Sequence, residues 1–165
     1  MFASGGTLSI GDTVSFSIVV NFRNGAKGFN LVNSSDGTLW SFNVGGDAYT
    51  QNGNSVFGNT YNANTEFDFT FTQTGSSTLH WSIDRRGGIV ASTSGDSTIT
   101  AGTIAGLHFY IHGTDNNSLS ENNLFFNNLA IIPVPEPANI ALAIFGGLAA
   151  TAAFARRARG WFVSL

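Results

Sequence analysis

Apolar and polar residues alternate along much of the chain before Pro133, and the alternation is clearest in the stretch TVSFSIVVNF, residues 13–22. Its apolar side chains share one face: Val14, Phe16, Ile18, Val20 and Phe22. A period of two residues is that of a half-buried β-strand, because successive side chains of a strand point to opposite faces. The same alternation predicts strands at residues 66–72, 78–83 and 106–112.

Shorter apolar stretches complete the predicted sandwich. They predict strands at residues 29–32, 39–44, 55–57, 88–93, 98–104 and 123–132. Clusters such as RNGAKG, NSSDG and DRRGG separate the strands, and their Asn-Gly, Asp-Gly and Gly-Gly pairs supply the positive φ angles of tight hairpins. About ten strands at this spacing predict an all-β fold, namely an antiparallel two-sheet β-sandwich of the jelly-roll type over residues 1–132.

The chain changes character after its last predicted strand. The stretch IIPVPEP holds all three prolines, and alternating prolines favour an extended linker, here residues 133–137. Residues 138–155 are apolar except for Asn139 and Thr151, and as a helix they would span about 27 Å of a bilayer core of about 30 Å. We expect a single transmembrane helix there, followed by a basic cytoplasmic tail at residues 156–165.

Charge divides along the same boundary. The chain has seven basic and ten acidic residues, a formal net charge of −3. Before Pro133, four basic residues stand against nine acidic ones, a net charge of −5, whereas after it three arginines stand against Glu136, a net charge of +2. An acidic body argues against nucleic-acid binding, which needs a basic footprint. By the positive-inside rule the arginines stay cytoplasmic, which places the β-domain across the membrane.

A Pro-Glu-Pro tripeptide, an apolar helix and an arginine cluster follow one another near the chain end, over about residues 133–159. Together they resemble the PEP-CTERM sorting signal of Gram-negative bacteria. The resemblance implies processing by exosortase, an integral-membrane cysteine protease or transpeptidase, and display at a surface associated with exopolysaccharide and biofilm. It implies these roles: a sorting motif at Pro135, Glu136 and Pro137, a transmembrane segment at 138–155, and a stop-transfer signal at Arg156, Arg157 and Arg159.

The beginning of the chain departs from that family. The stretch MFASGGTLSIGDTVSF contains no basic region and no apolar run of signal-peptide length, whereas PEP-CTERM proteins carry a signal peptide. We therefore expect the native start to lie upstream of Met1. The chain also has no cysteine, which excludes disulfides, thiolate metal sites and cysteine nucleophiles.

Glu66 and Asp68 are the strongest catalytic candidates of the β-domain. On one face of a strand they lie about 6.6 Å apart, near the carboxylate separation of retaining glycosidases, and the stretch resembles part of the Glu-x-Asp-x-x-Glu strand of jelly-roll glucanases. Thr70 and Phe71 stand where the third carboxylate would be. We therefore predict no catalytic residue and a non-enzymatic protein, with a glycan hydrolase or lyase as the weakest alternative.

Metal binding finds little support in the pattern. His108 and His112 share a strand face with Tyr110, but about 13 Å separates residues i and i+4 of a strand, too far to hold one ion. We predict no cofactor. Oxygen-rich loops at residues 45–54 and 115–123 leave a structural Ca²⁺ as an open alternative.

Aromatic residues suggest the main alternative function. The candidates for stacking on a sugar are Tyr110, Tyr49 and Tyr61. Trp40 and Trp81 are in register with apolar neighbours, so we assign both to the core, whereas Tyr110 alternates with Phe109 and is expected to be exposed. We predict a structural or adhesive protein, anchored in the membrane during export and then displayed at the cell surface or in the extracellular matrix. A carbohydrate-binding module for exopolysaccharide is the alternative.

Overall fold

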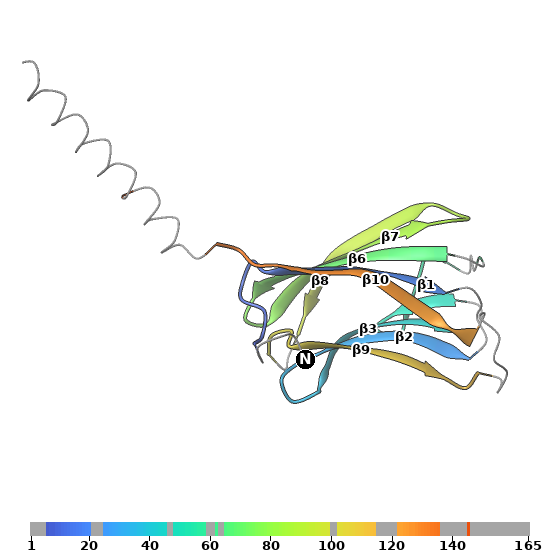
Figure 1. Ribbon diagram of the computed structural model, residues 1–165, viewed down its shortest axis with the longest axis horizontal. Helices are drawn as coiled ribbons and strands as arrows, with labels where there is room; N and C mark the ends of the chain where they lie inside the picture. Colours follow the sequence, from blue (N-terminus) through green and yellow to red (C-terminus); the bar gives the residue numbers. More distant parts are fainter. Residues whose placement is uncertain are drawn as a thin grey trace, which may run out of the picture. The chain divides into compact units, whose positions relative to one another are not determined.

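The computed structural model describes residues 6–20, 25–45, 48–58, 62, 65–99, 102–114, 122–135 and 145. These residues form ten strands in two five-stranded sheets, and each described neighbouring pair runs antiparallel (Figure 1). The predicted all-β, two-sheet architecture is confirmed.

Each sheet contains strands from separate parts of the chain. The first sheet contains, in spatial order, β10 (Leu124–Ile132), β1 (Thr13–Val20), β6 (Thr65–Gly75), β7 (Thr78–Arg86) and β8 (Ala91–Thr98). The second contains β5 (Asn54–Val56), β4 (Ala48–Gln51), β3 (Thr38–Gly45), β2 (Ala26–Val32) and β9 (Gly106–His112). The chain crosses between the sheets after β1, β5, β8 and β9. The last strand of each sheet in the sequence, β10 in the first and β9 in the second, lies at an edge of that sheet.

The core lies between the sheets and is rich in aromatic rings. The ring of Phe16 on β1 packs edge-on against that of Phe29 on β2, with 4.8 Å between centroids, and Phe29 does the same with Phe69 on β6 at 4.7 Å. Trp40 and Trp81 lie in this core, 0% and 8% exposed, as predicted. Each buried apolar side chain contributes about 1.5–3 kcal/mol, and aromatic pairs add about 0.5–1.5 kcal/mol.

Three strand predictions need correction. β4 was not predicted, because AYTQ buries only Tyr49 and shows no alternation. The strand expected at 88–93 begins at Ala91, since Gly87 and Gly88 both have positive φ and form the turn. In the described part of 98–104 there is no strand beyond the end of β8, although Ile99 and Ile104 are buried there.

Two basic residues expected in turn clusters lie in the interior instead. Lys27 and Arg85 are 0% and 1% exposed, because the inward alternation of β2 and β7 continues through them. The guanidinium group of Arg85 lies 4.9 Å from the ring centroid of Tyr49 and 5.9 Å from that of Phe57, a cation–π arrangement.

The chain divides into two compact units, Met1–Pro133 and Val134–Leu165, and all described strands belong to the first. Pro135 is exposed and lies outside regular structure. Glu136, Pro137, the three arginines and the predicted span at 138–155, apart from Phe145, lie outside the described residues. Within the described part of the chain, no helix is long and apolar enough to cross a membrane.

Candidate functional site

β10 forms one edge of the first sheet and β9 one edge of the second, and these two edges meet on the same side of the sandwich. Of the strands that the structure describes, β9 pairs with β2 alone and β10 with β1 alone. The rings of Phe109 on β9 and Phe126 on β10 stack with 4.5 Å between centroids and 15° between planes. This stacked pair bridges the two edges.

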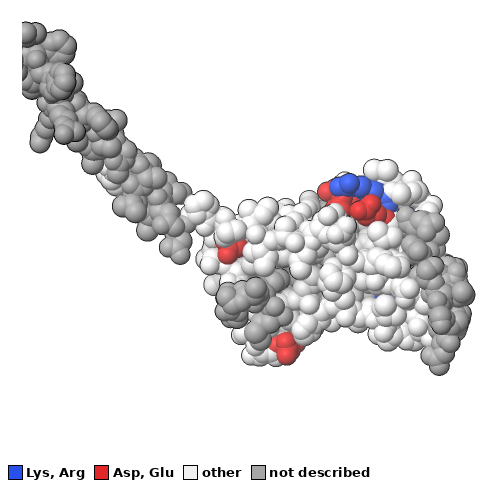
Figure 2. Space-filling view, viewed as in Figure 1, with Lys and Arg blue, Asp and Glu red and all other residues white. Residues whose placement is uncertain are grey.

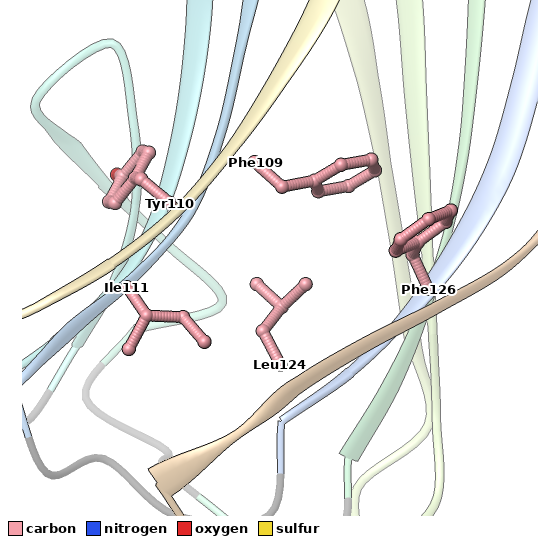
Figure 3. A pocket seen from close by; sticks show the side chains of 5 residues that line it. All are labelled: Phe109, Tyr110, Ile111, Leu124 and Phe126. Carbon is pink, nitrogen blue, oxygen red and sulfur yellow. The ribbon is translucent and has the colours of Figure 1, made fainter.

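A groove lies between these strands (Figure 3). It has a volume of about 280 Å³ and is lined by Phe109, Tyr110, Ile111, Leu124 and Phe126. Figure 3 shows Phe109 directed toward Phe126, with Leu124 between the strands. The lining is apolar except for the Tyr110 hydroxyl, which bonds elsewhere, so the groove suits apolar groups rather than charged ligands.

Apolar side chains emerge from both faces of β10. In register with β1, Phe126 lies opposite the buried Ile18, whereas Phe125 lies opposite Val19 on the other face. We call the most exposed of the apolar residues on these two edge strands the apolar rim: Ile111 (45% exposed), Phe125 (47%), Phe126 (56%), Leu129 (50%), Ile131 (41%) and Ile132 (60%). A strand that is apolar on both faces is typical of one covered on both sides, yet β10 is exposed.

A β-bulge interrupts β10 near its middle. Ser15 pairs with Ala130 but Ser17 pairs with Asn127, so two residues of β10 face one residue of β1. Asn128 in the bulge has a φ of +57°, in the left-handed region that Asn tolerates better than most residues. The bulge divides β10 into two regular halves.

A polar network supports the bulge from the outer face of the first sheet. The Asn128 side-chain amide donates to Ser17 Oγ at 3.4 Å, and Ser17 Oγ donates to Asp68 Oδ1 at 2.6 Å. Arg86 forms an ion pair with the same carboxylate. The network thus joins β10, β1, β6 and β7.

This network also explains the predicted carboxylate pair. Glu66 and Asp68 do share the outer face of β6, but Asp68 is engaged by Ser17 and Arg86, and Glu66 lies opposite Arg86 in the ladder. Figure 2 shows acidic and basic side chains gathered in one patch of the β-domain, over the region of β6 and β7. Among the described residues no group of three His, Asp or Glu side chains could hold a metal ion.

The predicted sugar-stacking tyrosines separate into different environments. Tyr49 is 1% exposed, and its ring packs against those of Phe42 and Phe67, so it cannot stack on a sugar. The pairing of β4 with β3 sets Tyr49 opposite the buried Val44 and so turns its side chain inward. Tyr61 lies outside the described residues.

Tyr110 was expected to be exposed and is instead half-buried on the outer face of the second sheet. Its hydroxyl donates to Asn43 Oδ1 at 3.0 Å and to the Phe42 carbonyl at 3.3 Å, reaching β3 across Gly28. A Cβ at Gly28 would lie 1.9 Å from that carbonyl and 2.9 Å from the hydroxyl, so glycine is required there. Burial raises the pKa of Tyr110 above its usual 10.0.

The histidines and the oxygen-rich loops, considered earlier as metal ligands, have structural roles where the structure describes them. His112 stacks on Tyr110 with 5.6 Å between ring centroids, and Nε2 of His108 lies 3.6 Å from Oδ1 of Asp36. In the oxygen-rich loop at 45–54, Asn52 accepts a hydrogen bond from the Ser41 backbone at 2.8 Å and has positive φ, as its Asn-Gly turn requires. The region 115–121 lies outside the described residues.

No family model, no characterised protein and no solved structure matches this chain. The apolar rim is the feature that sequence reasoning missed. A signal for it exists in LFFNNLAII, where apolar residues stand next to one another instead of alternating. That pattern predicts a strand covered on both faces, but it does not say what covers it.

Proposed function

We propose that this chain is an exported, non-enzymatic β-sandwich protein with a structural or adhesive role at a bacterial cell surface or in the extracellular matrix. A PEP-CTERM sorting signal, read by an exosortase-type enzyme in the membrane, delivers it there. The observation that carries the proposal is the order of three parts after β10: the tripeptide at 135–137, the apolar stretch at 138–155, and the arginines at 156, 157 and 159.

The division of the chain supports this assignment. The first compact unit ends at Pro133, and both sheets and the buried core lie within it. The sorting signal therefore follows every strand that the structure describes, so its removal would take none of these strands from either sheet. A processing enzyme needs such an arrangement if the released domain is to stay folded.

The outer faces of the sandwich support a passive role rather than a chemical one. Only 10% of the residues of the chain are charged, and the outward positions of β8 carry mainly Ser and Thr. Asp68, the carboxylate best placed for chemistry, is held by Ser17 and Arg86. Such surfaces are suited to hydrated matrix contacts.

The sorting assignment is tested by replacing Glu136 with Ala in a host that has an exosortase. We expect the wild-type protein to lose its C-terminal residues, while the Glu136→Ala variant is exported at full length. Intact-mass analysis of protein from producing cells measures this, with Glu66→Gln as the control for an acidic residue outside the motif. A wild-type C-terminus that stays intact in that host would overturn the assignment.

Carbohydrate binding is the second candidate, and the position of Tyr110 favours it. Its ring lies on the outer face of the second sheet beside His112, and half-buried amides of Asn30 and Asn43 share that face. Aromatic rings next to amides recognise sugars by stacking and hydrogen bonding.

The Tyr110→Ala variant should lose retention on exopolysaccharide in affinity electrophoresis, whereas Tyr110→Phe should keep it because the ring remains. Equal retention of wild type and Tyr110→Ala would remove the candidate.

A further inference from the structure

We propose that the apolar rim is a self-association surface. A second copy of this chain adds its own β10 to the free edge of β10, antiparallel and about a two-fold axis, so that the first sheets of the two copies become one continuous sheet. The inference names a partner for the β-domain, and it does not depend on the sorting signal.

The backbone of β10 is the first reason. The strand has nine residues, and among the described strands it pairs with β1 alone, so its other side presents N–H and C=O groups to an incoming strand. Proteins usually protect such an edge with lysines, inward-pointing charges or a proline. The sequence LFFNNLAII contains none of these, and the bulge at Asn128 is the one protective feature of the strand.

The amount of exposed apolar surface is the second reason. Aromatic side chains present about 150–250 Å² each and aliphatic ones somewhat less, so the six half-exposed residues of the apolar rim leave roughly 500 Å² in water. A patch of this size is at the upper end for a monomer. With the strand backbone added, it approaches the about 800 Å² that each partner contributes to a standard interface.

Charge favours a second copy as the occupant. The residues before Pro133 carry a formal net charge of −5, so two copies of the β-domain repel each other over most of their surface. β10 itself has no charged residue, and Figure 2 shows uncharged surface over the middle of β9 and β10, between small charged patches. Two copies therefore meet with least repulsion at the apolar rim.

Symmetry supports the same occupant. A two-fold axis perpendicular to a sheet edge brings identical strands together antiparallel, which is the sense of each described strand pair in this protein. The added strand also extends over the groove between β9 and β10. An uncharged, apolar, antiparallel partner strand is thus what β10 needs and what a second β10 provides.

The absence of native cysteine allows a clean test. Single cysteines are introduced at outward positions of β10, as Phe125→Cys, Asn127→Cys, Ala130→Cys and Ile132→Cys, in the full chain purified in detergent. Ser94→Cys on β8, the opposite edge of the same sheet, is the matched control. Because a disulfide needs Cα atoms about 4.4–6.8 Å apart, only positions next to the two-fold axis can cross-link.

We expect one or two of the β10 positions to form a disulfide-linked dimer on non-reducing gels, several-fold more than Ser94→Cys. In the cysteine-free chain, Ala130→Lys should shift the sedimenting species from dimer to monomer, whereas Ser94→Lys should not. Far-ultraviolet circular dichroism verifies that both variants remain folded.

A monomeric wild type, equal cross-linking at β8, or equal cross-linking at every β10 position would overturn the proposal. The partner that covers the apolar rim would then be a strand of another protein or C-terminal residues of the chain itself. None of these results affects the sorting assignment, which is read from the mass of the processed C-terminus.

Discussion

The two edges of the first sheet are built on opposite principles. β8 has the sequence ASTSGDST, and its residues alternate between half-buried and exposed, with Asp96 on the outer face. β10 has the sequence LFFNNLAII, and all of its residues except Leu124 are exposed. Among the described strands, β8 and β10 each have a neighbouring strand on one side of their backbone and none on the other. One edge is therefore hydrophilic and the other is apolar.

The difference in polarity between β8 and β10 indicates which edge of the sheet stays exposed to water. Small polar residues and a carboxylate on β8 make pairing with another strand unfavourable, as on many natural edge strands. The inner face of β8 is also covered, because the Trp81 ring packs against Gly95. β10 has no carboxylate and exposes apolar side chains instead, so the same sheet presents one protected edge and one edge available for contact.

The largest expected effect separates the core from the apolar rim. Phe16→Ala should lower the free energy of unfolding by about 3–5 kcal/mol, because Phe16 is 2% exposed and packs against the rings of Phe29, Phe69, Phe71 and Phe109. Phe126→Ala should cost much less, because Phe126 is 56% exposed. Urea unfolding followed by fluorescence measures both. Equal losses would mean that the apolar rim belongs to the core.

A smaller loss of stability should appear when a side chain is added at Gly95 on the inner face of β8. A Cβ at Gly95 would lie 2.9 Å from Cζ2 of Trp81, and the ring cannot move freely because it packs against Trp40 at 5.8 Å between centroids. Gly95→Ala should therefore cost about 1–3 kcal/mol. Ser94→Ala, exposed on the same strand, is the control and should change stability by less than about 0.5 kcal/mol. A neutral Gly95→Ala would show that β8 is not closed by Trp81.

The smallest effect concerns β9, the other strand of the apolar rim. Burial raises the pKa of Tyr110 above 10.0, so the fold favours the neutral phenol. The stability gained this way is fully present below the pKa of the unfolded chain and is lost as the pH rises through the higher folded value. Melting temperatures of wild type and Tyr110→Phe, measured from about pH 8 to about pH 11, should show a steeper alkaline decline in wild type. Parallel curves would contradict the raised pKa.

Sequence reasoning succeeded where periodicity and turn chemistry agree. β1, β6, β7 and β9 alternate over at least seven residues and were predicted close to their observed bounds. The Asp-Gly turn at Asp36, in the cluster NSSDG, was also predicted, and Asp36 has the positive φ that few residues tolerate. Trp40 and Trp81 were placed in the core by their apolar neighbours.

The remaining features depend on tertiary context. Lys27 and Arg85 look like turn residues in sequence, and only the pairing of β2 and β7 with their neighbours turns them inward. β4 is four residues long and forms because β3 and β5 flank it. The apolar rim escaped prediction because the sequence of β10 shows which residues are apolar but not that the strand lies at an edge.

The pairing of β1 with β10 has a consequence for how the protein is made. Asn128 on β10 and Ser17 on β1 are hydrogen-bonded although 111 residues separate them in sequence. Contacts so distant require closure of a long loop and form slowly. β1 leaves the ribosome, or emerges from a translocation channel, before β10, and the side of β1 that pairs with β10 stays unpaired until β10 arrives. Folding of the sandwich is therefore completed only when the whole domain has been delivered.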